Sequence, residues 1–133
     1  MGHEPRVALL SYSTFGNPLA EDTDRVRQVV AMLGARNVGF ECDGEMTPDV
    51  ALDPELLQHY LFCRLSGPAN VLVMPGLRSA SIAAKLLVKL GGATAIGPLL
   101  LGLSHAVQIV PMEATVTDIV NMAVMGCYHV VKA

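Results

Sequence analysis

Short apolar runs that lack polar alternation recur along this chain, and segments with helical spacing separate them. A run without alternation is typical of a strand covered on both faces, as in a parallel sheet. Parallel strands need crossover connections, which are right-handed and usually helical, so this order predicts helices layered on a sheet. The expected strands cover residues 6–11, 38–42, 70–75, 99–103 and 107–110.

Helical signals occupy the intervening segments. Residues 20–35 have an apolar face opposite acidic and basic positions, and Gly34 is a plausible stop. That face consists of Val26, Val29, Val30 and Leu33. A second helix is expected from Thr47, since Pro48 and Asp49 favour a helix start. The remaining helices are expected over residues 54–62, over residues 79–90 before Gly91 and Gly92, and from Thr115. The sequence therefore predicts an α/β fold, a three-layer sandwich with a mostly parallel sheet.

The composition excludes several classes of protein. The chain has 133 residues, is 52% hydrophobic and 16% charged, and has a mean hydropathy of +0.46, which is enough apolar surface for a core and excludes disorder. Nine basic and twelve acidic residues give a net charge of −3 with no long run of one sign, so we expect no nucleic-acid partner. The apolar excess indicates that some surface faces another subunit or domain.

Residues 91–112 contain no formal charge and are long enough to cross a bilayer. Pro98, Pro111 and several glycines interrupt them, however, so we expect no membrane span. The first apolar run is short and no signal-peptide cleavage site follows it. We expect a cytoplasmic protein.

Cysteine and histidine residues are scattered without the spacing of a metal or redox site. Cys42, Cys63 and Cys127 are therefore expected as reduced core residues, and no metal site is predicted. His105 lies between apolar runs, where a hydrogen-bonded structural role is favoured over a catalytic one.

Two loops that follow expected strands are candidate ligand sites, because ligands of open α/β sheets bind beyond the carboxyl ends of the strands. Exposed backbone N–H groups before a helix suit a phosphate or another anion, although such loops are also common for turn formation alone. The candidate binding residues are Ser11, Ser13, Thr14 and Gly16 in the first loop, and Gly76, Arg78 and Ser79 in the second.

Three carboxylates are candidates for acid–base chemistry. Asp43 and Glu45 could form a catalytic pair, but a solvated turn after a strand is the favoured interpretation. Asp118 follows Thr115 at the spacing of a capping box, which is sufficient to explain it.

Five segments in register resemble a known family, the phosphate acetyl/butyryl transferases, in its C-terminal part. They cover residues 7–16, 43–46, 66–77, 95–102 and 117–121. Within the family, the chain is most similar to the phosphotransacetylase-like C-terminal domain of the long NADP-dependent bacterial malic enzymes. The resemblance implies a partial phosphotransacetylase-like fold, with residues 1–133 forming the C-terminal part of that domain in a larger multidomain chain.

The resemblance also carries an expectation about catalysis. Active phosphotransacetylases have a Ser-Arg-Gly sequence before the last helix and then an Asp, which Asp118 matches. At the Ser and Arg positions this chain has Pro111 and Met112, and Glu113 replaces the Gly. Proline and methionine supply neither a base nor a cation, so Asp118 is expected to be vestigial.

The resemblance therefore implies a non-catalytic regulatory and oligomerisation domain of an NADP-dependent malic enzyme, with acetyl-CoA as allosteric effector. The effector would bind at the two loops, the assembly would be at least a homodimer, and no cofactor would bind this part. NADP and a divalent metal would belong to upstream domains. One alternative is a phosphate acyltransferase that converts acetyl-CoA and phosphate to acetyl phosphate and CoA, or a portion of one. Another is an assembly module with an empty cleft.

Overall fold

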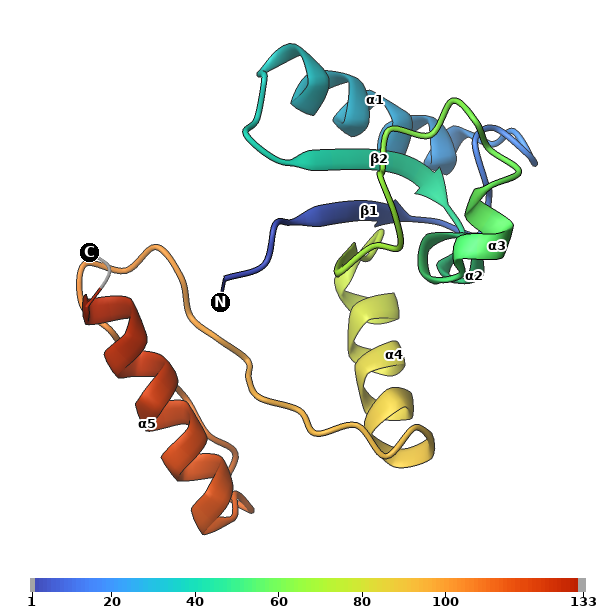
Figure 1. The fold of residues 1–133 in the computed structure, drawn as a ribbon. Coiled ribbons are helices and arrows are strands. Elements are labelled where there is room, and N and C mark those ends of the chain that lie inside the picture. The colour runs from blue at the N-terminus through green and yellow to red at the C-terminus, as the bar shows by residue number, and fades with distance from the viewer. Residues whose placement is uncertain (1, 132–133) are drawn as a thin grey trace. The chain divides into compact units, whose positions relative to one another are not determined.

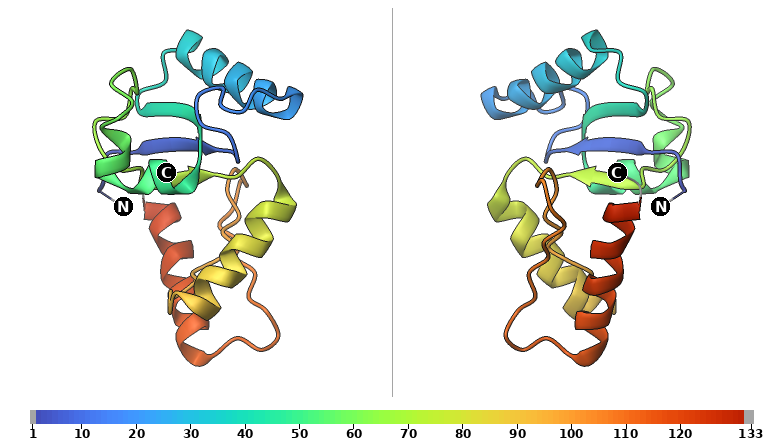
Figure 2. Two further views of the ribbon diagram at one scale, coloured as in Figure 1. Left: turned by 90° about the vertical axis from the view of Figure 1, so that its right-hand side faces the viewer. Right: turned by 90° about the vertical axis from the view of Figure 1, so that its left-hand side faces the viewer.

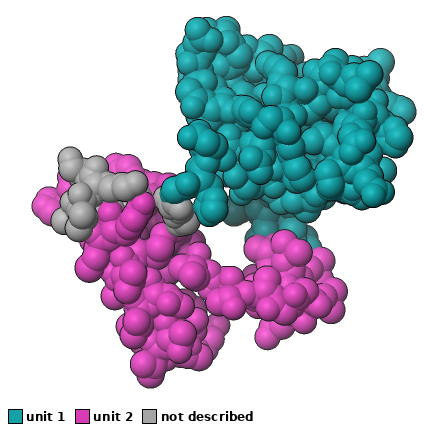
Figure 3. Space-filling model, in the orientation of Figure 1, with its two compact units in different colours: residues 1–83 teal, residues 84–133 magenta. Residues whose placement is uncertain are grey.

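The structure is a computed structural model that describes residues 2–131, and side chains up to residue 128. It divides into two compact units, residues 1–83 and residues 84–133 (Figure 3). The elements in chain order are β1 (Arg6–Leu10), α1 (Glu21–Ala35), β2 (Glu41–Met46), α2 (Pro48–Leu52), α3 (Pro54–Leu57), β3 (Val71–Val73), α4 (Leu77–Leu90) and α5 (Val116–Val131) (Figure 1).

The first unit is built on a three-stranded parallel sheet in the order β2-β1-β3. Figure 2 shows β1 between its two neighbours. The side chains of successive β1 residues point to opposite faces of the sheet, because side chains alternate along a strand. Ala8 and Leu10 join the core under α2 and α3, whereas Val7 and Leu9 join a smaller core with α1. The predicted three-layer α/β sandwich with a parallel sheet is confirmed.

Most helix boundaries agree with the sequence signals, although α1 runs through Gly34, the predicted stop, to Ala35. α1 starts after Ala20, α2 has Thr47 as N-cap with Pro48 at its first turn, and α4 ends at Leu90 before the two glycines. The helix expected over residues 54–62 is shorter than predicted, because only Pro54–Leu57 are helical. Val30 is buried as expected, whereas Val29, on the same predicted face, is 45% exposed.

Three strand predictions need correction. The strand expected over residues 38–42 begins at Glu41 and runs on to Met46, through the polar residues for which a turn is predicted. The run over residues 70–75 forms only Val71–Val73, and all three side chains are exposed, since β3 is an edge of the described sheet. An edge strand has neighbours on one side only, so it cannot be buried like a central one.

The third correction concerns residues 99–103 and 107–110, because neither predicted strand forms in the described part of the chain. An apolar run becomes a strand only where another strand satisfies its backbone N–H and C=O groups. The second unit contains no strand among its described residues. It consists of the last part of α4, an irregular segment over residues 91–115, and α5.

The second unit is poor in buried side chains. Met122 is the one buried apolar side chain described there, and α4 has none. Residues 106–110 and α5 enclose a shallow groove of about 440 Å³. Among the described residues, no helix has the length and apolarity needed to cross a bilayer.

The cysteine predictions are only partly correct. All three cysteines are free thiols. Cys42 is buried and Cys63 is half-buried, but Cys127 is exposed, so the expectation that it is a core residue is wrong.

Gly44 is a position where the fold requires a glycine. It has a φ of +145°, and a Cβ atom there would lie 2.5 Å from the carbonyl oxygen of Leu9 on the neighbouring strand. The Gly44→Ala variant should lose about 3 kcal/mol of unfolding free energy, because both backbone strain and a backbone clash are added. Urea unfolding measures this loss. Gly39→Ala is the matched control, since nothing lies within 4 Å of a Cβ there. Equal stabilities of the two variants would contradict the account.

Candidate functional site

The loop between β1 and α1 contains the first group of predicted binding residues. It is closed by two hydrogen bonds of 3.1 Å that join the backbones of Thr14 and Asn17. Ser11, Ser13 and Thr14 are buried, and Gly16 is half-buried. The loop is therefore a folded turn whose hydroxyl groups point into the protein.

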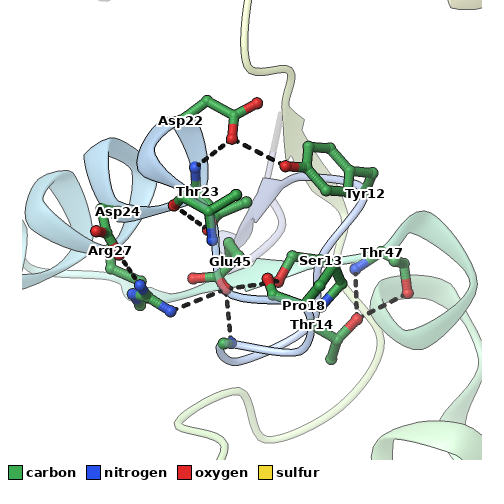
Figure 4. A network of polar contacts seen from close by, with 12 residues as sticks. Tyr12, Ser13, Thr14, Pro18, Asp22, Thr23, Asp24, Arg27, Glu45 and Thr47 are labelled. Atoms are coloured by element: carbon green, nitrogen blue, oxygen red, sulfur yellow. Dashed lines mark hydrogen bonds and ion pairs between the residues drawn. The ribbon is translucent and has the colours of Figure 1, made fainter.

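The hydroxyl groups of Ser13 and Thr14 form hydrogen bonds within the protein (Figure 4). The single proton of the Ser13 hydroxyl is shared between the Pro18 carbonyl at 2.8 Å and Glu45 Oε1 at 3.0 Å. Thr14 Oγ1 accepts a hydrogen bond from the Thr47 backbone N–H at 3.1 Å and lies 3.0 Å from the Thr47 hydroxyl. These contacts fix the loop against the end of β2 and the start of α2.

Glu45 is the central residue of this network, a role that the sequence alone does not indicate. Its side chain is fully buried, and Oε1 accepts a 2.7 Å hydrogen bond from the backbone N–H of Gly16. The guanidinium of Arg27, which also pairs with Asp24, lies 3.5 Å from the same oxygen. A buried carboxylate needs such partners because water is excluded.

Asp43 has a corresponding role on the other side of β2. It is buried and accepts hydrogen bonds from the backbone N–H of Arg64 at 2.7 Å, from the Arg64 guanidinium at 3.0 Å and from Gly44 N–H at 3.0 Å. The bond to Asp43 raises the pKa of Arg64 above its usual value.

The solvated turn predicted at Asp43 and Glu45 is thus wrong, since both carboxylates are buried within a strand. Neither carboxylate is accessible as an acid or base in the structure. Glu45 is hydrogen-bonded to the β1–α1 loop, and Asp43 is hydrogen-bonded to Arg64 in the segment after α3. The Asp-Gly-Glu motif is the one sequence signal for these structural roles. It is not sufficient to predict them, because the arginines that contact Asp43 and Glu45 lie far away along the chain.

The second predicted loop follows β3 and leads into α4; Gly76 lies in this loop, whereas Arg78 and Ser79, which are predicted there, lie in the first turn of α4. Gly76 and Arg78 are exposed and Ser79 is half-buried, with its hydroxyl donating a 2.8 Å hydrogen bond to the Gly76 carbonyl. Because β1 and β3 are adjacent parallel strands, both loops lie at the same edge of the sheet. The structure shows no hydrogen bond between the described residues of the two loops.

Asp118 lies in the second unit, in the first turn of α5. Its Oδ2 accepts hydrogen bonds from the Thr115 backbone N–H at 2.9 Å and the Thr115 hydroxyl at 2.7 Å, while Asp118 N–H bonds back at 3.2 Å. The predicted capping box is confirmed. The two bonds from Thr115 lower the pKa of Asp118 below 3.8. Pro111 and Met112 are both exposed.

The histidine and metal predictions can also be compared with the structure. His105 is exposed in an irregular segment, and its Nδ1 lies 3.1 Å from the Ser104 hydroxyl, which agrees with a hydrogen-bonded structural role. Among the residues whose side chains the structure describes, no group of three His, Cys, Asp or Glu side chains could hold a metal ion.

The buried carboxylate of Glu45 should determine the order of the β1–α1 loop. In Glu45→Gln, one bond from Gly16 or Ser13 weakens and Arg27 loses its buried partner, so we expect a loss of about 2 kcal/mol of unfolding free energy. We also expect faster amide exchange over residues 13–17. Urea unfolding and hydrogen-exchange mass spectrometry measure both. Glu21→Gln, whose ion pair with Arg25 is exposed, is the control and should change neither.

The capping box predicts a specific pH dependence. The folded pKa of Asp118 is depressed, so its contribution to stability is present above 3.8 and is lost as the pH falls through the lower, folded value. In Thr115→Val the hydroxyl donor is lost, and the pKa of Asp118 should rise towards 3.8. Carboxyl titration followed by NMR measures the shift, and an unchanged midpoint would contradict the assignment.

Comparison with known proteins agrees with the fold and the motifs. The family described as Phosphate acetyl/butaryl transferase matches residues 1–127. An NADP-dependent malic enzyme of Rhizobium meliloti (strain 1021) is 55% identical over 97% of this chain and 17% of its own length. A phosphate acetyltransferase of Paracoccus denitrificans is 40% identical over 91% of this chain and 38% of its own length.

Solved structures give the same result. A phosphotransacetylase from Streptococcus pyogenes superposes with a TM-score of 0.90 at 31% identity, covering 98% of this chain and 40% of that one. This chain therefore spans about a sixth of the malic enzyme and two fifths of the transferases. The family match over almost the whole sequence, together with the structural similarity, shows that the chain belongs to the phosphate acetyl/butyryl transferase family.

Proposed function

We propose that this chain is a non-catalytic regulatory and oligomerisation domain of an NADP-dependent malic enzyme, and that acetyl-CoA is its allosteric effector. The observation that carries the proposal is the pair Pro111 and Met112, which stands where active phosphotransacetylases have their Ser and Arg. The 55% identity to a malic enzyme of which this chain covers 17% supports the assignment to such a protein.

The chemistry of acyl transfer explains why this pair is decisive. Transfer between CoA and phosphate needs a base for the thiol, and donors or cations for the developing oxyanion and phosphate charge. Proline has no side-chain polar group and no N–H, and methionine has no charge. Losing two such groups costs about 5–8 kcal/mol, or about four to six orders of magnitude in rate. Asp118 itself is engaged by Thr115, and the sequence contains no arginine after Arg78.

The effector would bind at the edge of the sheet where the two loops lie. Gly76 and Arg78 are exposed there, and an Arg guanidinium is well suited to the phosphates of CoA. Gly16 and Ser79 are half-buried and would contribute at the margin. Ser11, Ser13 and Thr14 are buried, so they would act by shaping the first loop rather than by direct contact.

Exposed apolar side chains support a role in assembly. Soluble monomers rarely expose a large contiguous apolar surface. On α4 and α5 the exposed side chains include Ile82, Leu86, Leu87, Leu90, Val116, Ile119, Val120 and Val124. Contact with at least one further subunit would bury such surface. An effector that binds two assembly states unequally then shifts the equilibrium between them.

The upstream part of the protein would carry the malate chemistry, with NADP and a divalent metal bound there. The free thiols of this chain agree with a reducing compartment, and we place the protein in the cytoplasm.

The test is the response of the full-length enzyme to acetyl-CoA. We expect acetyl-CoA to change malate oxidation about fivefold or more, with a parallel change in assembly measured by analytical ultracentrifugation. Arg78→Gln should weaken the response, whereas Arg36→Gln, an exposed arginine at the end of α1, should not. A response that is absent at physiological acetyl-CoA concentrations would refute the effector role and favour a purely structural module.

The alternative is a working phosphate acyltransferase, or a portion of one, and the 40% identity to a phosphate acetyltransferase supports it. The same preparation should form no acetyl phosphate from acetyl-CoA and phosphate. Acetyl phosphate formation that disappears in Asp118→Asn would establish the alternative and overturn our proposal.

A further inference from the structure

Three aromatic rings from distant parts of the first unit meet beside the β1–α1 loop. The chain has only six Phe and Tyr residues, and three of them converge here. Phe15 lies at the tip of the loop, with its ring centroid 4.9 Å from that of Phe62 and 5.4 Å from that of Tyr60. Tyr60 and Phe62, which follow α3, are 6.1 Å apart in an edge-to-face arrangement. We call Phe15, Tyr60 and Phe62 the aromatic cluster.

The aromatic cluster forms one side of a cavity of about 550 Å³, a size typical of small-molecule sites. The rest of the lining is mixed. Val50 and Leu56 are apolar, and the polar lining residues are Thr14, Asn17, Thr47, Asp49 and His59. The cavity borders the larger core, since Val50 belongs to that core and Phe15 and Tyr60 pack against it, but its polar lining residues distinguish it from the core itself.

The cluster is not fully explained as core packing. Phe62 is 67% exposed and so leaves much of its ring available to a ligand. Phe15 has a φ of +47°, an unfavourable conformation for a bulky residue. Its N–H donates a 2.8 Å hydrogen bond to the Glu45 carbonyl, and the Thr14–Asn17 bridge holds the turn around it. Strain maintained in this way is a reason to look for a binding role.

The charge of the lining restricts the class of ligand. Asp49 is the one carboxylate among the lining residues, and no lysine or arginine among the described residues lines the cavity. A hydrogen bond from Thr47 lowers the pKa of Asp49, which keeps it anionic. A phosphate is therefore disfavoured in the cavity itself, whereas a neutral planar ring with an amino group is favoured. The exposed Asn17 carboxamide has the donor and acceptor needed to pair with the edge of an adenine.

We propose that this cavity binds the adenine ring of a CoA ester, stacked on the aromatic cluster. The inference rests on the proposed function, because it assigns the adenine of the proposed effector to the cavity beside the tip of the β1–α1 loop. Thr14 and Phe15 belong both to the cavity and to the β1–α1 loop, so one extended ligand can contact both. The adenine would supply affinity, and the acyl end would lie elsewhere.

The experiment compares two ligands and three variants in the full-length protein, with saturating NADP present to occupy any dinucleotide site. The ligands are acetyl-CoA and acetyl-4′-phosphopantetheine, which lacks the adenosine part. Phe62→Ala should weaken acetyl-CoA binding about tenfold in calorimetry and leave acetyl-phosphopantetheine binding unchanged, because stacking on an aromatic ring is lost. Phe62→Tyr should retain the affinity. Leu61→Ala is the matched control: it is 94% exposed and does not line the cavity.

The outcomes separate this inference from the proposed function. If acetyl-CoA binds and Phe62→Ala weakens both ligands equally or neither, the adenine site is refuted and the effector role stands. If acetyl-CoA does not bind, the effector role fails, and adenosine 3′,5′-bisphosphate then tests the cavity alone. Binding of that nucleotide, lost in Phe62→Ala and kept in Leu61→Ala, would support the adenine site, and absence of binding would refute it.

Discussion

The buried carboxylate of Glu45 is the contact on which the candidate site depends. A single oxygen receives the Gly16 N–H and shares the Ser13 proton, and it faces the Arg27 guanidinium. An anion in this position would be strongly unfavourable without those partners. The β1–α1 loop therefore adopts the shape in which its N–H and hydroxyl groups can reach the Glu45 carboxylate. Through the same strand, the Glu45 carbonyl fixes the N–H of Phe15.

Features of the fold that depend on local sequence could be predicted. The Thr115–Asp118 capping box and the start of α2 involve residues within four positions of each other, so spacing is enough to specify them. β2 shows the opposite case. Asp43 and Glu45 look like turn residues because they are polar, and only distant partners such as Arg64 and Arg27 allow them inside a sheet.

The same reasoning applies to the strands and the cavity. Residues 99–103 and 107–110 have the composition of buried strands, but strand formation also requires a neighbour with free backbone groups. That requirement is not encoded within either run. The aromatic cluster could not be predicted either, since Phe15 and Phe62 come from different loops that are far apart in the sequence and meet only in the folded chain.

The division into two units bears on the proposal of a binding domain without catalytic activity. The two sheet-edge loops, with Glu45 and its partners, belong to residues 1–83, whereas Pro111, Met112 and Asp118 belong to residues 84–133. The contacts described above for the β1–α1 loop are made by residues of the first unit. In the proposed function, Pro111 and Met112 stand at the positions of the catalytic Ser-Arg pair, and neither residue is among those that make these contacts. If the function is as we propose, the groups lost from catalysis and the groups that shape the binding loop are different residues, so a substitution at the former does not by itself remove the latter.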